Sequence, residues 1–101
     1  MDKILCVIKN PGEPPRVEHI ENTLEALQKA VGGYIETVTI ATDLIIICNE
    51  EGLLHNLPYN CHIANCQFVG TIVAVSAKGD EFASIKAQNI PFVLDIMGRK
   101  Q

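Results

Sequence analysis

The chain has 101 residues, of which 48% are hydrophobic and 20% are charged. This length suits one domain, and the apolar content excludes a disordered chain, because such a chain cannot bury enough apolar area to offset its ordering entropy. The net charge of -4 comes without a basic stripe, which argues against direct nucleic-acid binding. The first apolar run has only five residues, too few for a signal peptide or a membrane span, so we expect a cytoplasmic protein without a membrane partner.

Two elements are predicted in the first third of the chain. Five consecutive apolar residues, Ile4 to Ile8, predict a strand buried on both faces. After Pro14-Pro15, apolar residues recur at spacings of three and four and predict one long amphipathic helix, which should end at Gly32-Gly33. The predicted apolar stripe consists of Val17, Ile20, Leu24, Leu27 and Val31.

The middle of the chain is rich in β-branched residues. Residues 34 to 48 predict two strands that reverse at residues 41 to 43, and the second of them, Leu44 to Cys48, is apolar on both faces. Asn49 to Gly52 predicts a type I turn with Gly52 at positive φ, after which Leu53-Leu54 returns as a short strand. Residues 55 to 69 are expected to form an irregular connection.

The last third predicts a strand, a turn and a short helix. "TIVAVS" follows Gly70 as a strand, and a helix is expected over Glu81 to Gln88 with Asp80 as its N-cap. We therefore expect an α+β fold, in which one mixed or antiparallel sheet packs against one main helix with a short second helix. Residues 1–88 should form a single domain, and residues 89–101 a C-terminal extension that docks on the domain or on a partner chain.

The predicted sheet has more apolar surface than one helix can cover. Three strands are apolar on both faces, whereas a helix about 10 Å wide covers only about two strands spaced ~4.8 Å apart. The connection and the apolar tail could cover the second face, or a second copy of the chain could do so. We expect a symmetric homodimer, because paired copies of one patch are the commonest way to bury such a surface.

Four cysteines divide into two pairs. Cys6 and Cys48 lie in apolar runs and are predicted to be core residues. Cys61 and Cys66 lie in a polar connection, where a reducing compartment disfavours a disulfide. With His55 and His62 they make four metal-ligand types within twelve residues, but this spacing is not that of a zinc site and the adjacent Cys61 and His62 chelate one ion poorly. All four are therefore weak candidates, and we expect no metal and no cofactor.

The stretch "NEEGLLHNLPYN", residues 49 to 60, is the main candidate surface. Its asparagines can tie backbone groups in a turn or hold a ligand. Its adjacent glutamates point in different directions and do not make the opposed carboxylate pair of acid/base chemistry, so no enzyme is expected. The candidate ligand or partner surface consists of Asn49, Glu50, Glu51, His55, Tyr59 and Asn60.

An ordered set of short motifs carries a family resemblance. "LQKAVGGYIETV", "IIICNEEGLLHNLPYN" and "VGTIVAVS" followed by "GDEFASI" cover roughly residues 24 to 85. The set resembles the domain of unknown function DUF3846, which implies a phage, a plasmid or an integrated element of Gram-positive bacteria and brings no established biochemistry. The chain departs from the pattern at Cys61, where a basic residue is expected, and in "KAQNIPFVLDIMGRKQ", which runs past the usual end.

Two functions of different class follow from these observations. The first is a non-catalytic small binding protein of a phage or mobile element, acting in the host bacterial cytoplasm. It would engage a host protein or a small molecule, for example to blunt a defence system. The alternative is a metal- or cysteine-dependent activity centred on residues 55–66.

Overall fold

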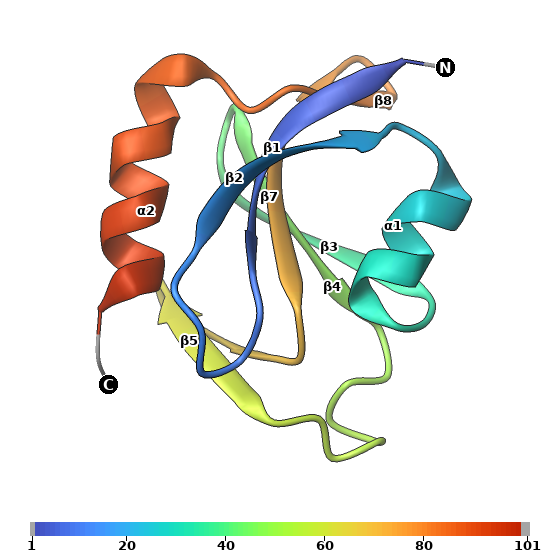
Figure 1. The fold of residues 1–101 in the computed structure, drawn as a ribbon, viewed down its shortest axis with the longest axis vertical. Helices are drawn as coiled ribbons and strands as arrows, with labels where there is room; N and C mark the ends of the chain where they lie inside the picture. Colours follow the sequence, from blue (N-terminus) through green and yellow to red (C-terminus); the bar gives the residue numbers. More distant parts are fainter. Residues whose placement is uncertain (1, 100–101) are drawn as a thin grey trace.

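The computed structural model describes residues 2–99 as an antiparallel sheet with a helix on each face (Figure 1). The strand order is β2-β1-β7-β4-β3, β8 pairs with β7, and β5 and β6 form a separate two-stranded sheet. The elements in chain order are β1 (Lys3–Lys9), β2 (Arg16–Glu21), α1 (Leu24–Val31), β3 (Ile35–Ala41), β4 (Leu44–Asn49), β5 (Tyr59–Ile63), β6 (Cys66–Val69), β7 (Ile72–Lys78), β8 (Glu81–Ala83), the 3-10 helix η1 (Ala87–Asn89) and α2 (Ile90–Gly98).

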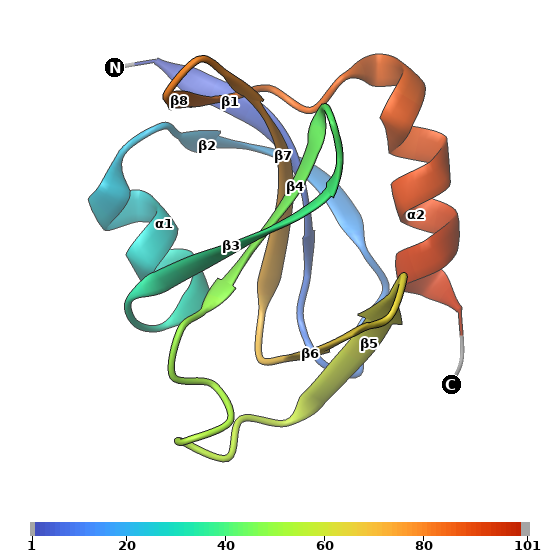
Figure 2. The ribbon, with the colours of Figure 1, turned by 180° about the vertical axis from the view of Figure 1, so that it is seen from behind.

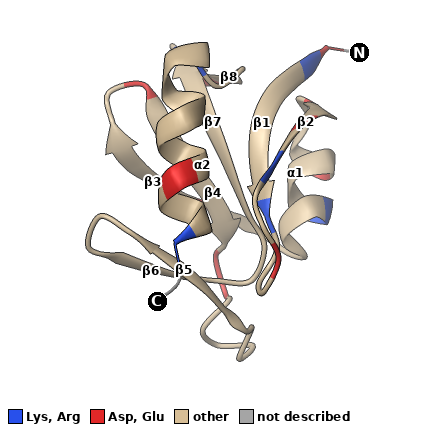
Figure 3. Ribbon diagram, turned by 60° about the vertical axis from the view of Figure 1, so that its left-hand side comes forward, with Lys and Arg blue, Asp and Glu red and all other residues tan. Residues whose placement is uncertain are grey.

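The predicted α+β class is confirmed, and every strand pair is antiparallel. The helices α1 and α2 have 8 and 9 residues, so neither is the main one. Seen from the side, α2 and α1 lie on opposite sides of the sheet (Figure 3). The fold is thus a helix, a sheet and a second helix in three layers.

Strand alternation divides the interior into two apolar clusters, one on each face. On the first face, Leu27 and Val31 of α1 pack with Ile47, Val73 and Val75 of the sheet. On the second face, α2 and the β5–β6 hairpin cover the sheet together, and the buried side chains there include Val7, Ile46, Ala74, Cys61, Phe68, Val93 and Met97. The apolar runs in β1, β4 and β7 follow from this arrangement, because both faces of these strands are covered.

The predicted long helix is wrong in its first half. Val17 and Ile20 lie in β2, where Val17 pairs with Val7 of β1. The helix begins only at Leu24, because the Thr23 hydroxyl accepts a hydrogen bond from the Ala26 amide at 3.1 Å and caps it. Val17 and Ile20 are three residues apart, a spacing that fits a helix but also occurs between two β-branched residues of a strand. Pairing with β1 decides for the strand. Leu24 is 57% exposed and lies off the buried face.

Three predictions between Asn49 and Val69 are also wrong. Positive φ angles occur at other glycines and not at Gly52. Gly52 is buried, and a Cβ added there would lie 2.8 Å from Val69 Cγ2, so close packing and not backbone conformation favours glycine at this position. Leu53-Leu54 is part of a turn and not a strand. The expected irregular connection contains the β5–β6 hairpin, whose turn uses a positive φ at Ala64, a residue that gives no sequence signal for it.

The helix predicted over Glu81 to Gln88 is not formed. Residues 81 to 83 pair with β7 as β8, so Asp80 belongs to a turn and caps no helix. Phe82 packs against the first apolar cluster, whereas Ile85 is buried in the second. An extended segment reaches from one face to the other, which a helix of this length would not do.

The apolar tail forms α2 and packs on the sheet of its own chain, with Val93 and Met97 buried. The second sheet face is therefore covered without a second copy. This removes the reason from which the homodimer was predicted, and the homodimer itself stays a prediction. Met1, Lys100 and Gln101, which belong to the two predicted segments 1–88 and 89–101, lie outside the described residues.

Candidate functional site

Asn49 ties the start of the candidate surface to the end of α1. Its buried side chain donates from Nδ2 to the Val31 carbonyl at 3.1 Å and accepts at Oδ1 from the Glu51 amide at 2.8 Å. A carbonyl at the last turn of a helix has no partner within the helix, so this bond closes the end of α1. Asn49 is therefore a structural residue, which is the first of its two predicted roles.

Gly33 and Asn49 fit together across the same junction. A Cβ at Gly33 would lie 2.8 Å from Asn49 Nδ2, closer than packed atoms approach. Gly32 holds a left-handed φ of 81° as the helix cap, and its amide donates to the Gln28 carbonyl. The motifs "GGYIE" and "NEEG" are thus two sides of one contact.

The segment after Asn49 is held by its own backbone. The amide of Gly52 donates to the Asn49 carbonyl, that of His55 to Glu51, that of Asn56 to Leu53 and that of Leu57 to Gly52, at 2.9 to 3.2 Å. Leu57, the last residue of this turn, is half-buried against Gly70, where an added Cβ would lie 2.7 Å from Leu57 Cδ1. Residues 50 to 57 form this turn, which we call the projecting turn, and it lies at the end of the molecule away from β8 (Figure 2).

Two adjacent leucines stand in solvent on this turn. Leu53 is 77% exposed and Leu54 is 74% exposed. Both line a groove of about 390 Å³ between the turn, the end of β4 and β6, with Glu36, Glu50 and Phe68 on its other sides. Neither leucine was among the predicted site residues, although "GLLH" in a turn flanked by polar residues is the pattern that could have indicated them.

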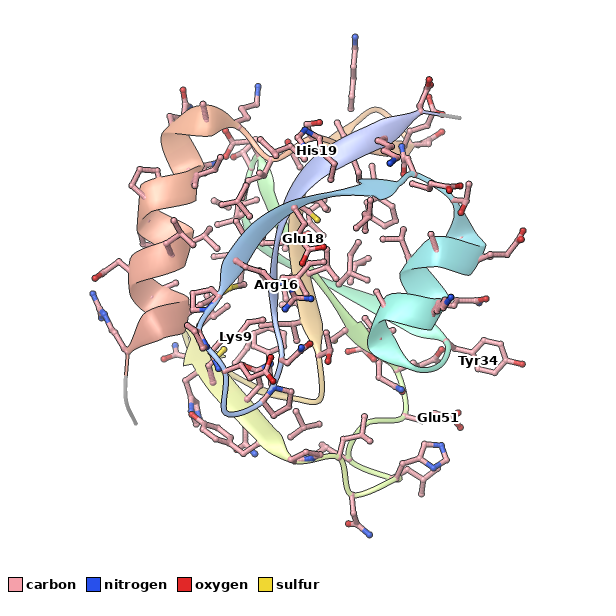
Figure 4. The ribbon with its side chains drawn as sticks, in the orientation of Figure 1. Lys9, Arg16, Glu18, His19, Tyr34 and Glu51 are labelled. Atoms are coloured by element: carbon pink, nitrogen blue, oxygen red, sulfur yellow. The ribbon has the colours of Figure 1, made fainter. Side chains whose placement is uncertain are left out.

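A second, smaller pocket lies at the carboxyl end of α1. It has a volume of about 290 Å³ and is lined by Gln28, Gly32, Gly33, Tyr34, Asn49, Glu51 and His55. Tyr34 is 65% exposed, and its side chain and that of Glu51 project outward on the same side of the molecule (Figure 4). The His55 Nε2 atom lies 3.6 Å from Glu51 Oε1 and forms an ion pair only when the imidazole is protonated.

Asn60 is a second structural tie. It is buried, and its Nδ2 atom donates to the carbonyls of Lys9 at 2.8 Å and Gly70 at 2.7 Å. Its Oδ1 atom has no hydrogen-bond partner among the described residues. The bonds join β5 to the ends of β1 and β6, so Asn60 lies below the exposed surface that it was predicted to help form.

Tyr59 and His62 form a separate polar pair on the β5–β6 hairpin. The Tyr59 hydroxyl and His62 Nδ1 lie 2.6 Å apart. Tyr59 lines neither the groove nor the pocket described above.

The four weak metal candidates do not converge. Cys61 is buried against the cluster beneath α2, and burial raises the pKa of its thiol, whereas the neighbouring His62 faces solvent. Cys66 is half-buried at the start of β6, and His55 lies on the projecting turn. Within residues 2–99 no group of three or more His, Cys, Asp or Glu side chains could hold a metal ion.

The six residues of the predicted candidate surface thus have different positions. Glu50, Glu51 and His55 lie on one surface, Tyr59 lies apart from it, and the buried Asn49 and Asn60 stabilise the backbone beneath it.

The stretch of sequence that contains the projecting turn carries acidic charged residues only. From Ala30 to Ala77 the sequence contains four acidic residues, Glu36, Asp43, Glu50 and Glu51, and no Lys or Arg. The basic residues of the described chain lie on other elements (Figure 3). The groove is lined by Glu36, Glu50 and Glu51 and the pocket by Glu51, with no Lys or Arg in either lining, whereas Lys29 lies in the last turn of α1.

Comparisons with known proteins give one finding. A family model described as Domain of unknown function (DUF3846) matches residues 3–97. The match includes residues 86 to 97 of "KAQNIPFVLDIMGRKQ", so the prediction that this segment runs past the usual end of the family is wrong for those residues. No curated protein and no solved structure matches the chain. Among the helices of residues 2–99, none is both long and apolar enough to cross a membrane.

Proposed function

The chain belongs to the DUF3846 family, whose description assigns no biochemical activity, and from this premise we propose that it is a non-catalytic binding protein. It acts for a phage or a mobile element in the host cytoplasm by docking on a host protein, and blunting a host defence is one use of such binding. The docking surface consists of the projecting turn and the groove beside it.

The observation that carries this proposal is the exposure of Leu53 and Leu54 on a well-supported turn. Scattered exposed leucines are ordinary on a protein surface. Two adjacent ones that are about three-quarters exposed, next to a groove of about 390 Å³, make a compact apolar feature with a fixed shape. Apolar contact areas of this kind mark interaction sites, and a preformed turn loses little conformational entropy on binding.

The Asn49 and Gly33 contact supports the same reading. Hydrogen bonds from Asn49 and within the turn hold the leucines in place, although neither leucine is needed to fill the core. The contact between the two family motifs that contain Asn49 and Gly33 thus stabilises an exposed surface, which favours binding over catalysis. The nearby carboxylates of Glu50 and Glu51 give that surface a negative rim, which favours a partner with basic residues around an apolar pocket.

Capture from a host lysate with matched variants tests the proposal. The double variant Leu53→Asp with Leu54→Asp should lose a partner that the wild-type chain retains. Leu24→Asp is the control, because Leu24 is also an exposed leucine but lies at the start of α1. It should retain the partner. Equal capture by all three chains would contradict the proposal, and native mass spectrometry of the purified chain would reveal a bound small molecule if the ligand is not a protein.

A further inference from the structure

We infer that the pocket at the carboxyl end of α1 receives the guanidinium group of an arginine side chain from the docked partner. This inference rests on the proposed function and specifies its partner. The pocket is separate from the leucine groove, although Asn49 and Glu51 line both. One partner segment could therefore occupy the two sites at once.

The electrostatics of the pocket favour a cation for two independent reasons. The carboxyl end of a helix carries a partial negative charge, and α1 ends at Val31, beside the pocket-lining residues Gly32 and Gly33. The Glu51 carboxylate lies in the same pocket. Both act on the same volume, and no Lys or Arg lines it, because Lys29 in the last turn of α1 lies outside the pocket lining. An anionic ligand would meet repulsion from each of them.

The side chains of the pocket favour guanidinium among cations. Tyr34 and Glu51 both line the pocket and project outward on the same side of the molecule (Figure 4), and a planar guanidinium can stack on an aromatic ring while its N–H groups donate to a carboxylate. Gln28 also lines the pocket, and its side-chain amide contains an oxygen that can accept a hydrogen bond. With a volume of about 290 Å³ the pocket has room for one side chain and not for a folded segment.

The surroundings of the pocket fit this occupant. The groove beside the pocket is lined by Glu36, Glu50 and Glu51 and by no Lys or Arg, so a basic partner segment would be attracted toward it. His55 also lines the pocket, and its Nε2 atom lies 3.6 Å from Glu51 Oε1. An arginine that enters the pocket would take the place of His55 beside this carboxylate.

The test is a titration of the full chain with N-acetyl-arginine amide, followed by nuclear magnetic resonance of the backbone amides. We expect shifts that saturate and are largest at Gly32, Gly33, Tyr34 and Glu51. N-acetyl-citrulline amide has nearly the same shape without the charge, and it should bind much more weakly. Equal binding of the two compounds, or shifts spread over the whole surface, would overturn the inference.

Two variants make the test specific to the pocket. Glu51→Gln should weaken arginine binding by roughly two- to fivefold, the size expected for an exposed ion pair. Glu50→Gln is the matched control, because Glu50 is the neighbouring carboxylate but lines only the leucine groove, and it should bind as the wild-type chain does. An equal loss in both variants would show general surface attraction and would overturn the inference.

The two proposals fail in distinguishable ways. If partner capture depends on Leu53 and Leu54 but the arginine compound does not bind, the inference about the pocket is wrong and the proposed function stands. If the arginine compound binds in the pocket but partner capture ignores the leucines, the pocket is a cation site and the docking surface is wrong.

Discussion

Gly33 is the residue at which a single added methyl group should disturb the site most. In Gly33→Ala the new Cβ would lie 2.8 Å from Asn49 Nδ2, so Asn49 must move and lose its bond to the Val31 carbonyl. We expect a loss of ~1–3 kcal/mol in the free energy of unfolding, measured by denaturant titration, because a buried polar group is left without its partner.

Gly98→Ala is the matched control for this change. No atom lies within 4 Å of a Cβ added at Gly98, and the residue sits at the end of α2. Alanine is the better helix former, so this variant should be as stable as the wild-type chain or slightly more stable. Equal stability of the Gly33 and Gly98 variants would show that the Asn49 contact is not tight.

The buried thiols predict how stability depends on pH. Burial, helped by the Glu18 carboxylate, raises the pKa of Cys6 from 9.0 to about 11. Burial and the Glu36 carboxylate raise the pKa of Cys48 in the same way, also to about 11. Each thiol donates a hydrogen bond to a backbone carbonyl, Cys6 to Glu18 and Cys48 to Glu36, which only the protonated form can do.

The sign follows from these pKa values. Below pH 9 both thiols are protonated in the folded and in the unfolded chain, so their contribution to stability is complete. Between pH 9 and 11 the unfolded chain releases protons that the folded chain retains, and stability falls as the pH rises. Unfolding titrations of the wild type and of Cys6→Ala with Cys48→Ala should show a steeper fall for the wild type, and parallel curves would contradict the burial of the thiols.

Two substitutions in α1 distinguish the helix seen in the structure, Leu24–Val31, from the longer helix predicted from the sequence. Leu27 is 1% exposed and packs against the sheet, so Leu27→Asp places an unpaired charge in the interior and should unfold the domain. Leu24→Asp should fold, because Leu24 is exposed and a carboxylate in the first turn of a helix is favourable. Circular dichroism during heating checks both, and an unfolded Leu24→Asp variant would restore the long helix predicted from the sequence.

The elements that could be predicted are those whose signal is local. Consecutive apolar residues indicate β1, β4 and β7, because a strand covered on both faces has no polar side. Val17 and Ile20 misled the prediction, because their spacing suits either element and only the hydrogen bonds to β1 decide. The hairpin from residue 59 to 69 was missed for a similar reason, since its turn depends on a positive φ at Ala64.

The candidate site was predicted in part. Glu50, Glu51 and His55 do lie on the projecting turn, and the hydrogen bonds of Asn49 and Asn60 show the structural one of their two predicted roles. Tyr34 could not be placed at the site from the sequence, because it precedes β3 and reaches the pocket only through the pairing of β3 with β4, beyond which its carbonyl accepts a hydrogen bond from the Glu50 amide. Contacts of this kind depend on sheet topology, which no local pattern specifies.

At the scale of the whole molecule, the second apolar cluster depends on α2. A chain that ends at Gln88 would lose Val93 and Met97 and would leave Val7, Ile46 and Ala74 facing water. We expect this truncated chain to bind an apolar dye strongly and to aggregate or sediment as an oligomer, because exposed apolar surface of this extent is seldom tolerated in a monomer. A truncated chain that stays monomeric and binds no dye would show that α2 is dispensable for the core.

Hydrogen exchange measures whether the projecting turn is the surface at which a partner binds. Amide exchange is measured for the full chain alone and in complex with the captured partner. We expect slower exchange in residues 50 to 57 and at Gly32 to Tyr34 upon binding, with β2 and α2 unchanged. Protection confined to β2 or α2, with the turn still exchanging freely, would contradict this expectation.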